Sequence, residues 1–195
     1  DAAPSPVPFS LLLNLVSVLG SDDPEHLLGY VRRYAPEAAE GADPARDPLP
    51  ALCRHAVNYY KDFVEPRKRR RAPTEAEAEA LRALMASLRE RAGDLQDLPP
   101  DDRARAIQDL VYDAGRREPF LDTSKEGRPG VSRAWFNALY QVLLGQPEGP
   151  RFGSFVALYG IPGTIGLMET ALATLVRLGE APAGRLASWL AGAVT

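Results

Sequence analysis

The fold class is decided by one stretch of the sequence, Ser132-Arg133-Ala134-Trp135-Phe136-Asn137-Ala138-Leu139-Tyr140-Gln141-Val142-Leu143-Leu144-Gly145. Apolar side chains occupy nearly all of its positions, and only Asn137 and Gln141 form a polar strip. Ser132 is suited to cap the start of a helix, and a glycine such as Gly145 is common just past a helix end. A helix that is apolar almost all round is buried. The stretch therefore predicts a core helix over residues 132–144.

Helical periodicity continues along nearly the whole chain. No segment shows sustained alternation of apolar and polar residues, and no Asn-Gly or Asp-Gly hairpin turn occurs. Thr74 followed by Glu77 forms a capping box, which marks a helix start. The sequence predicts an all-α multi-helix bundle. The other expected helices cover about 8–19, 24–34, 49–64, 74–92, 101–117, 154–159, 163–178 and 184–194.

Two prolines divide the chain. Pro66 and Pro73 bracket a stretch that is expected to be extended rather than helical. We expect an N-terminal three-helix lobe over residues 1–66 and a larger helical bundle over residues 67–195.

Composition limits the function classes. With 195 residues, of which 45% are apolar and 25% charged, the chain is neither disordered nor collagen-like. A formal net charge of −3 excludes a generic basic nucleic-acid coat, so any polyanion site must be local. The lone Cys53 cannot form an internal disulfide and favours a cytoplasmic location. We expect no membrane segment, and Asp1 in place of Met indicates a chain processed or cut from something longer.

Five consecutive cations, Arg67 to Arg71, form the most conspicuous charged run, and residues 61–71 carry a net charge of +4. Arginine and lysine neutralise nucleic-acid phosphates, so the run is suited to phosphate contact. A solvated charge run explains it equally well. The nearby rings Tyr59, Tyr60 and Phe63 favour RNA slightly, because unstacked bases stack on rings, but such spacing is also typical of a helix core.

Catalytic patterns are weak. Cys53 and His55 point apart on one helix and have no second pair of ligands, which argues against a metal site or a Cys–His nucleophile. The four-residue spacing of Arg105, Asp109, Asp113 and Arg117 predicts surface ion pairs rather than acid–base chemistry. No glycine-rich phosphate loop follows a strand. We expect no catalytic residues and no metal.

Four blocks of the sequence resemble the C-terminal third of class I lysyl-tRNA synthetases. They occur in the order of that family and together span about residues 9–170. They are Phe9 to Leu15 with Arg33 to Pro36; Tyr59 to Pro66 with Arg70 to Pro73; Ala106 to Gly115; and Trp135 through Gly149-Pro150-Arg151-Phe152-Gly153 to Gly160. A looser version of the last block also resembles the anticodon-binding end of glutamyl-tRNA synthetases.

The resemblance implies that residues 67–195 form the α-helix cage, an anticodon-binding region that grips lysine-accepting tRNA. In that family a separate Rossmann-type domain activates lysine with ATP and Mg²⁺. Neither the His-Ile-Gly-His signature nor the Lys-Met-Ser-Lys-Ser loop is present, so this chain alone is expected to be inactive, with no cofactor, and to partner the missing catalytic domain. DNA is not an expected partner. The alternatives are a glutamyl-type anticodon-binding part and a non-enzymatic helical module for protein interaction.

The site residues expected from residue type and position fall into three groups. The basic run would contact tRNA phosphates, two rings would stack splayed bases, and an arginine with two amides would read base edges. These residues are Arg67, Lys68, Arg69, Arg70 and Arg71; Tyr140 and Phe152; and Arg151, Asn137 and Gln141.

Overall fold

The computed structural model describes residues 7–36, 47–124 and 129–179. Its elements confirm the all-α prediction in the described part of the chain. The expected helix over 184–194 lies outside the described residues. The α-helices are α1 (Phe9–Leu19), α2 (Pro24–Tyr34), α3 (Leu49–Tyr59), α4 (Glu75–Glu90), α5 (Ala92–Gln96), α6 (Pro100–Gly115), α7 (Arg133–Leu143), α8 (Phe152–Tyr159) and α9 (Ile161–Gly179).

Three local features differ from the predictions. The short helix α5 (Ala92–Gln96) lies almost wholly between the expected helices over 74–92 and 101–117. The expected helix over 49–64 is α3 followed by a π-helical turn, η2 (Tyr60–Val64), and a 3₁₀ turn, η3 (Glu65–Arg67). The loop after α6 contains a two-stranded antiparallel sheet of β1 (Leu121–Asp122) and β2 (Gly130–Val131), with Leu121 opposite Val131. Two residues per strand are too few to produce the alternation by which a strand is recognised in sequence.

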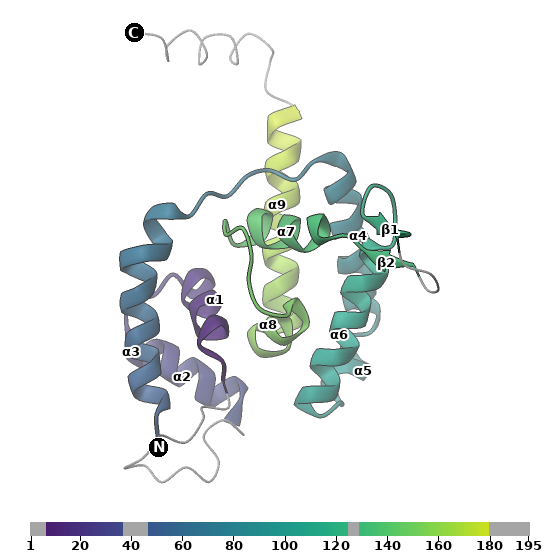
Figure 1. Cartoon of the computed structure of the whole chain (residues 1–195). Helices are drawn as coiled ribbons and strands as arrows, with labels where there is room; N and C mark the ends of the chain where they lie inside the picture. Colours follow the sequence, from purple (N-terminus) through teal and green to yellow (C-terminus); the bar gives the residue numbers. More distant parts are fainter. Residues whose placement is uncertain (1–6, 37–46, 125–128, 180–195) are drawn as a thin grey trace, which may run out of the picture.

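The helices form three groups (Figure 1). The first consists of α1 to α3 and the second of α4 to α6, while α7 to α9 lie between them. One hydrophobic core runs through all three groups, from Leu12 and Leu15 through Leu84 and Ile107 to Phe155. The segment after η3 crosses from the first group to the second, at the place where the proline-bracketed stretch was predicted.

Of the two helix caps predicted from the sequence, the one at Thr74 is present and the one at Ser132 is not. The Thr74 hydroxyl accepts from the Glu77 N–H at 3.3 Å, and the Glu77 carboxylate accepts from the Thr74 N–H at 2.8 Å, which confirms the capping box. The Ser132 side chain makes no capping hydrogen bond, so the sequence pattern placed the start of α7 correctly but not its cap.

The middle of the molecule is tightly packed around Trp135. Its indole is fully buried and donates a hydrogen bond to the Val111 carbonyl at 2.9 Å. Gly115 on α6 lies against this ring, where a Cβ atom would come within 2.6 Å of the Val131 side chain. The buried face of the quoted stretch thus joins α7 to α6, as a core helix should.

Helices α6 and α8 pack so closely that the backbone of one lies against the backbone of the other. A Cβ atom on Gly153 would clash with the Ala104 carbonyl and lie 2.8 Å from the backbone nitrogen of Gln108. In turn, the Gln108 side-chain oxygen accepts from the Gly153 N–H at 2.8 Å. Because only a glycine fits here, α8 is fixed closely against α6.

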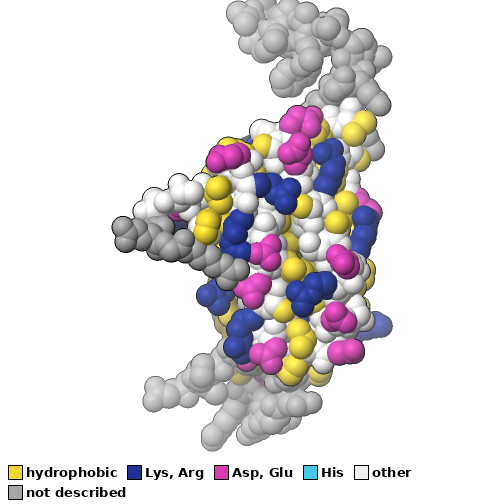
Figure 2. All heavy atoms as spheres, turned by 90° about the vertical axis from the view of Figure 1, so that its right-hand side faces the viewer, with side chains coloured by type: hydrophobic (Ala, Val, Ile, Leu, Met, Phe, Trp, Pro, Cys, Tyr) yellow, Lys and Arg dark blue, Asp and Glu magenta, His cyan; other side chains and the backbone are white. Residues whose placement is uncertain are grey.

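The face formed by α4 to α6 carries interspersed charges of both signs (Figure 2). Arg105 pairs with Asp102 at 3.0 Å, and Arg116 pairs with Asp113. The prediction of pairs four residues apart was therefore wrong in its partners, since both pairs span three residues. This face shows the mixed surface of a solvated helix rather than a cationic patch.

Within the described residues, no single helix is long and apolar enough to cross a membrane. Helices α8 and α9 pass such a test only as a pair, and the pair is bent by 112°.

Candidate nucleic-acid interface

The basic segment, defined as Arg67 to Arg71, is held against the C-terminal end of α7. The Arg69 N–H donates to the Gly145 carbonyl at 2.9 Å, and the Gln141 amide donates to the Arg69 carbonyl. Gly145 has a φ of +72°, and a Cβ atom there would lie about 3 Å from the side chains of Lys68 and Arg70. The segment is thus fixed to the end of α7 through both backbone groups of Arg69.

Lys68 turns inward. Its ammonium group donates to the Ser17 carbonyl in the last turn of α1 at 2.9 Å and to the Tyr60 hydroxyl at 3.2 Å. It also lies 5.6 Å from the centre of the Tyr60 ring. Burial, and then the charge of Arg70, lower the pKa of Lys68. A lysine at a helix C-terminus satisfies free carbonyls, so this side chain attaches the segment to the first helix group instead of facing a phosphate, which corrects the role predicted for it.

Arg71 is likewise engaged. Its guanidinium donates two parallel hydrogen bonds to the Glu77 carboxylate, at 2.6 and 2.7 Å. Burial alone would raise the pKa of Glu77, but the hydrogen bonds from Arg71 and Thr74 outweigh it and hold that pKa below its usual value. A bidentate pair with a buried carboxylate is among the strongest ionic contacts. Arg71 therefore anchors the segment to α4 and is a second correction to the predicted phosphate contacts.

Arg67, Arg69 and Arg70 are exposed. Arg69 donates only to nearby carbonyls, those of Pro66 at 3.1 Å and Lys68 at 2.9 Å. Arg67 and Arg70 make no side-chain hydrogen bond or ion pair within the described residues. Three of the five predicted phosphate contacts are thus presented to solvent, on a segment whose backbone is fixed.

The aromatic residues before the segment divide between core and surface. Tyr60 is 6% exposed, whereas Tyr59 and Phe63 are about half exposed. The two exposed rings pack 5.0 Å apart between centres, and Phe9 meets Tyr59 edge-on at 6.0 Å. The π-helical turn η2 puts Tyr60 under Lys68 and leaves Phe63 outside. The surface pair, rather than Tyr60, is the part available to a nucleobase.

The two rings predicted to stack bases lie in the core. Tyr140 is 3% exposed, Phe152 is 1% exposed, and they meet edge-on at 5.8 Å. The Tyr140 hydroxyl donates to the Pro150 carbonyl, and burial raises the pKa of Tyr140 well above its usual value. Their role here is to hold the turn between α7 and α8, and no base can reach them without unpacking this core.

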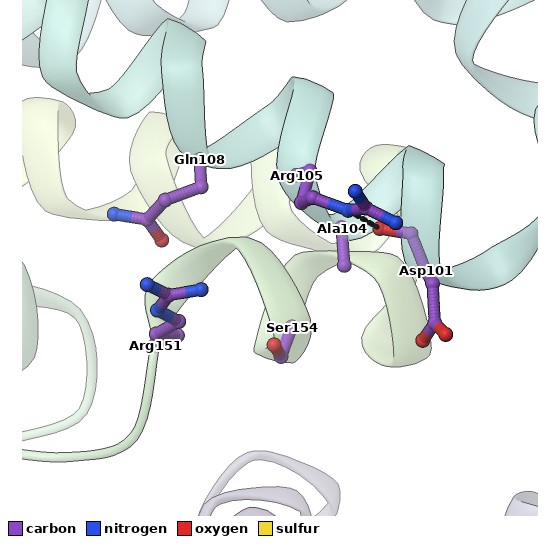
Figure 3. A pocket seen from close by; sticks show the side chains of 6 residues that line it. All are labelled: Asp101, Ala104, Arg105, Gln108, Arg151 and Ser154. Carbon is purple, nitrogen blue, oxygen red and sulfur yellow. Dashed lines mark hydrogen bonds between the residues drawn. The ribbon is translucent and has the colours of Figure 1, made fainter.

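Arg151 lies at a hollow of about 230 Å³ between α6 and α8 (Figure 3). Its side chain makes no hydrogen bond or ion pair with the described part of the chain. Asn137 is exposed on α7 and does not line the hollow, and Gln141 is occupied by Arg69. The structure therefore does not bring together the predicted trio for reading bases. It instead surrounds the hollow with Asp101, Ala104, Arg105, Gln108, Arg151 and Ser154.

Sequence reasoning missed four polar members of this set. Asp101, Arg105 and Gln108 recur every three or four residues on α6, which puts them on one helix face. Ser154 comes from the first turn of α8. The spacing on α6 was the available signal, but the place of these residues around one hollow with Arg151 depends on the glycine contact between α6 and α8.

No group of three or more His, Cys, Asp or Glu side chains capable of holding a metal occurs among the described residues. Cys53 is fully buried, and burial raises its pKa to about 11. A thiol in this state is a poor nucleophile at neutral pH. The exposed arginines and the polar residues around the hollow provide groups that can bind anions and polar ligands.

Comparisons with known proteins point to one kind of enzyme. The chain is 44% identical over 167 residues to a lysine–tRNA ligase of Roseobacter denitrificans. It is 36% identical over 166 residues to one from Rickettsia bellii and 34% identical over 163 residues to one from Rickettsia conorii. The chain is homologous to a region of these lysine–tRNA ligases. The matches cover 84 to 86% of this chain but only 28% of each relative, and no family model matches.

The chain spans less than a third of the length of these relatives. The homology supports the predicted resemblance at the level of the ligase, and the all-helical structure supports the predicted fold. The surface around Arg67, Arg69 and Arg70 and the hollow at Arg151 are its two candidate binding features.

Proposed function

We propose that this chain is the anticodon-binding region of a class I lysine–tRNA ligase, which holds lysine-accepting tRNA in the cytoplasm. The observation that carries the proposal is the exposure of Arg67, Arg69 and Arg70 on a segment whose backbone is fixed at Arg69, which follows in sequence the exposed rings of Tyr59 and Phe63. Fixed cations next to accessible rings suit a looped RNA strand, which offers phosphates and unstacked bases together. The homology to lysine–tRNA ligases supports tRNA as the ligand.

The proposal assigns activation of lysine to the remainder of the ligase, with ATP and Mg²⁺ bound there. The expected role of this region is to position the tRNA, and the chain alone is expected to form no lysyl-adenylate.

Binding of lysine tRNA across a salt series tests the proposal. The purified chain should bind lysine tRNA at least tenfold more tightly than the same tRNA with an exchanged anticodon. Equal affinity for both would refute anticodon recognition. Preference for a glutamate tRNA would favour the glutamyl-type alternative, and absence of binding would favour a protein-interaction module.

The triple variant R67Q/R69Q/R70Q identifies the phosphate contacts. It should flatten the slope of log affinity against log salt by about 0.7 for each lost contact, or about 2 in all. The matched control R54Q/R82Q/R91Q removes three other exposed arginines and should leave the slope unchanged. Equal slopes for both triple variants would remove the basic segment from the interface.

A further inference from the structure

The hollow at Arg151 contains four polar groups that the fold leaves unused. They are the Arg151 guanidinium, the Ser154 hydroxyl, the Asp101 carboxylate and the amide nitrogen of Gln108. None of these groups makes a side-chain hydrogen bond or ion pair within the described residues, whereas the nearby Arg105 is paired with Asp102 at 3.0 Å. Unused groups that converge on a cavity are characteristic of ligand sites.

The walls of the hollow are fixed by contacts beneath it. The Gln108 oxygen is held by the Gly153 N–H at 2.8 Å, so its amide orientation is set. Arg103 donates to the carbonyls of Leu95, Gln96 and Leu98 at 2.9 to 3.0 Å, which ties the preceding turn to the start of α6. A ligand therefore meets a site that is already formed, and little ordering is required on binding.

A larger, more apolar cavity of about 540 Å³ adjoins the hollow and shares Asp101, Ala104 and Ser154 with it. Its lining includes the apolar residues Leu11, Pro100 and Leu158. The chemistry thus changes along one continuous depression, from a free arginine through hydrogen-bonding groups to an apolar surface. A nucleotide combines the same kinds of group, since it carries a phosphate, a flat ring and a polar edge on that ring.

We propose that this depression, between α6 and the N-terminal turn of α8, binds one unpaired nucleotide of the tRNA loop, with its phosphate at Arg151 and its base edge at Ser154 and Asp101. The inference rests on the proposed function and extends it to a specific subsite. Arg151 donates to phosphate oxygens, and the N-terminus of α8 adds a favourable dipole for an anion. The Asp101 carboxylate accepts from N–H groups of the base, so bases without a free N–H at that edge are disfavoured.

An abasic scan tests the subsite. Anticodon stem-loops are prepared with each loop nucleotide in turn lacking its base, and their binding to the chain is measured. The wild type should show one position at which removal of the base weakens binding about tenfold or more. In S154F, which fills the hollow, the intact RNA should bind about tenfold more weakly, and the penalty at that position should disappear. The control A86F adds the same ring to the exposed face of α4 and should retain the penalty.

Two milder variants keep the test decisive if S154F does not fold. D101N should reduce the abasic penalty at the same position, and R151Q should lower affinity for every stem-loop and reduce the salt slope by about 0.7. If D101N and S154F both leave all abasic penalties unchanged, the subsite is refuted while anticodon binding stands. If the wild type binds no stem-loop, the proposed function itself fails.

Discussion

The basic segment and the hollow at Arg151 both carry cations, but the structure uses them in opposite ways. In the segment, Lys68 donates to the Ser17 carbonyl and Arg71 donates to the Glu77 carboxylate, so both side chains are bound within the protein. At the hollow, Arg105 pairs with Asp102, but Arg151 makes no such contact within the described residues and lies near other unpaired polar groups. The number of charges in a stretch of sequence therefore does not show how many of them a ligand can reach. Here, two of the five basic side chains bind other groups of the protein.

The largest expected effect concerns the contact on which the hollow depends. In G153A the new methyl group would clash with the Ala104 carbonyl, a backbone atom that cannot move aside. Overpacking at a backbone contact should cost about 3 kcal/mol of unfolding free energy. Denaturant unfolding of G153A measures this.

The control for that experiment is G166A on α9, where a Cβ atom would meet nothing within 4 Å. Replacing glycine by alanine inside a helix should stabilise this variant by about 0.5–1 kcal/mol. If G153A were as stable as G166A, the close α6–α8 packing would not define the hollow.

The helical regions show how far sequence alone could predict these two features. The periodicity of apolar residues predicted most of the helices and their order but not α5, and Thr74 with Glu77 predicted the capping box correctly. Periodicity reports only which face of a helix is buried. It could not show that Tyr140 and Phe152 both face the core, because an aromatic residue suits a core and a base-stacking surface equally.

The direction of each basic side chain was also beyond the sequence. Five adjacent cations look equivalent until Tyr60, Ser17 and Glu77 are brought beside two of them by tertiary packing. Likewise, Arg151 is separated by about fifty residues from Asp101, and only the α6–α8 contact brings them to one hollow. Contacts between distant parts of the chain determine which charges remain free, and a single sequence does not reveal such contacts.

The second largest effect is expected at the anchor of the basic segment on α4. E77A removes both hydrogen bonds to Arg71 and half of the capping box. Loss of a cap and of an ionic contact whose carboxylate is buried should cost about 2 kcal/mol. Thermal unfolding measures the loss, and E75A, an exposed acid in the same first turn, should lose less than about 0.5 kcal/mol.

The same carboxylate predicts a pH dependence. The folded-state pKa of Glu77 lies below its ordinary value of 4.5, so the ionised group stabilises the fold above that pH. The contribution is lost as the pH falls through 4.5 and then through the lowered pKa. The difference in unfolding free energy between wild type and E77Q should therefore shrink from pH 6 to pH 3. A constant difference would show that the charge of Glu77 does not stabilise the segment.

An intermediate effect should separate anchoring cations from presented ones. K68M removes the inward ammonium, so the affinity for lysine tRNA should fall about fivefold because the segment is less well fixed, while the salt slope stays unchanged. R70Q should instead reduce the slope by about 0.7. A reduced slope in K68M would return Lys68 to the phosphate contacts, and unchanged affinity would show that its anchoring role is irrelevant to binding.

The smallest effect is expected from one hydroxyl group. Tyr60 accepts a hydrogen bond from Lys68 at 3.2 Å in a nearly buried position, and the neighbouring Tyr59 is about half exposed with no hydrogen bond from its hydroxyl among the described residues. Y60F leaves Lys68 with the Ser17 carbonyl as its remaining partner, so the cost should be about 0.5–1 kcal/mol. Y59F should change stability by less than about 0.5 kcal/mol. Equal unfolding midpoints for Y60F and Y59F would mean that the Ser17 carbonyl alone holds Lys68. The π-helical turn, which positions Tyr60, would then not contribute to fixing the basic segment.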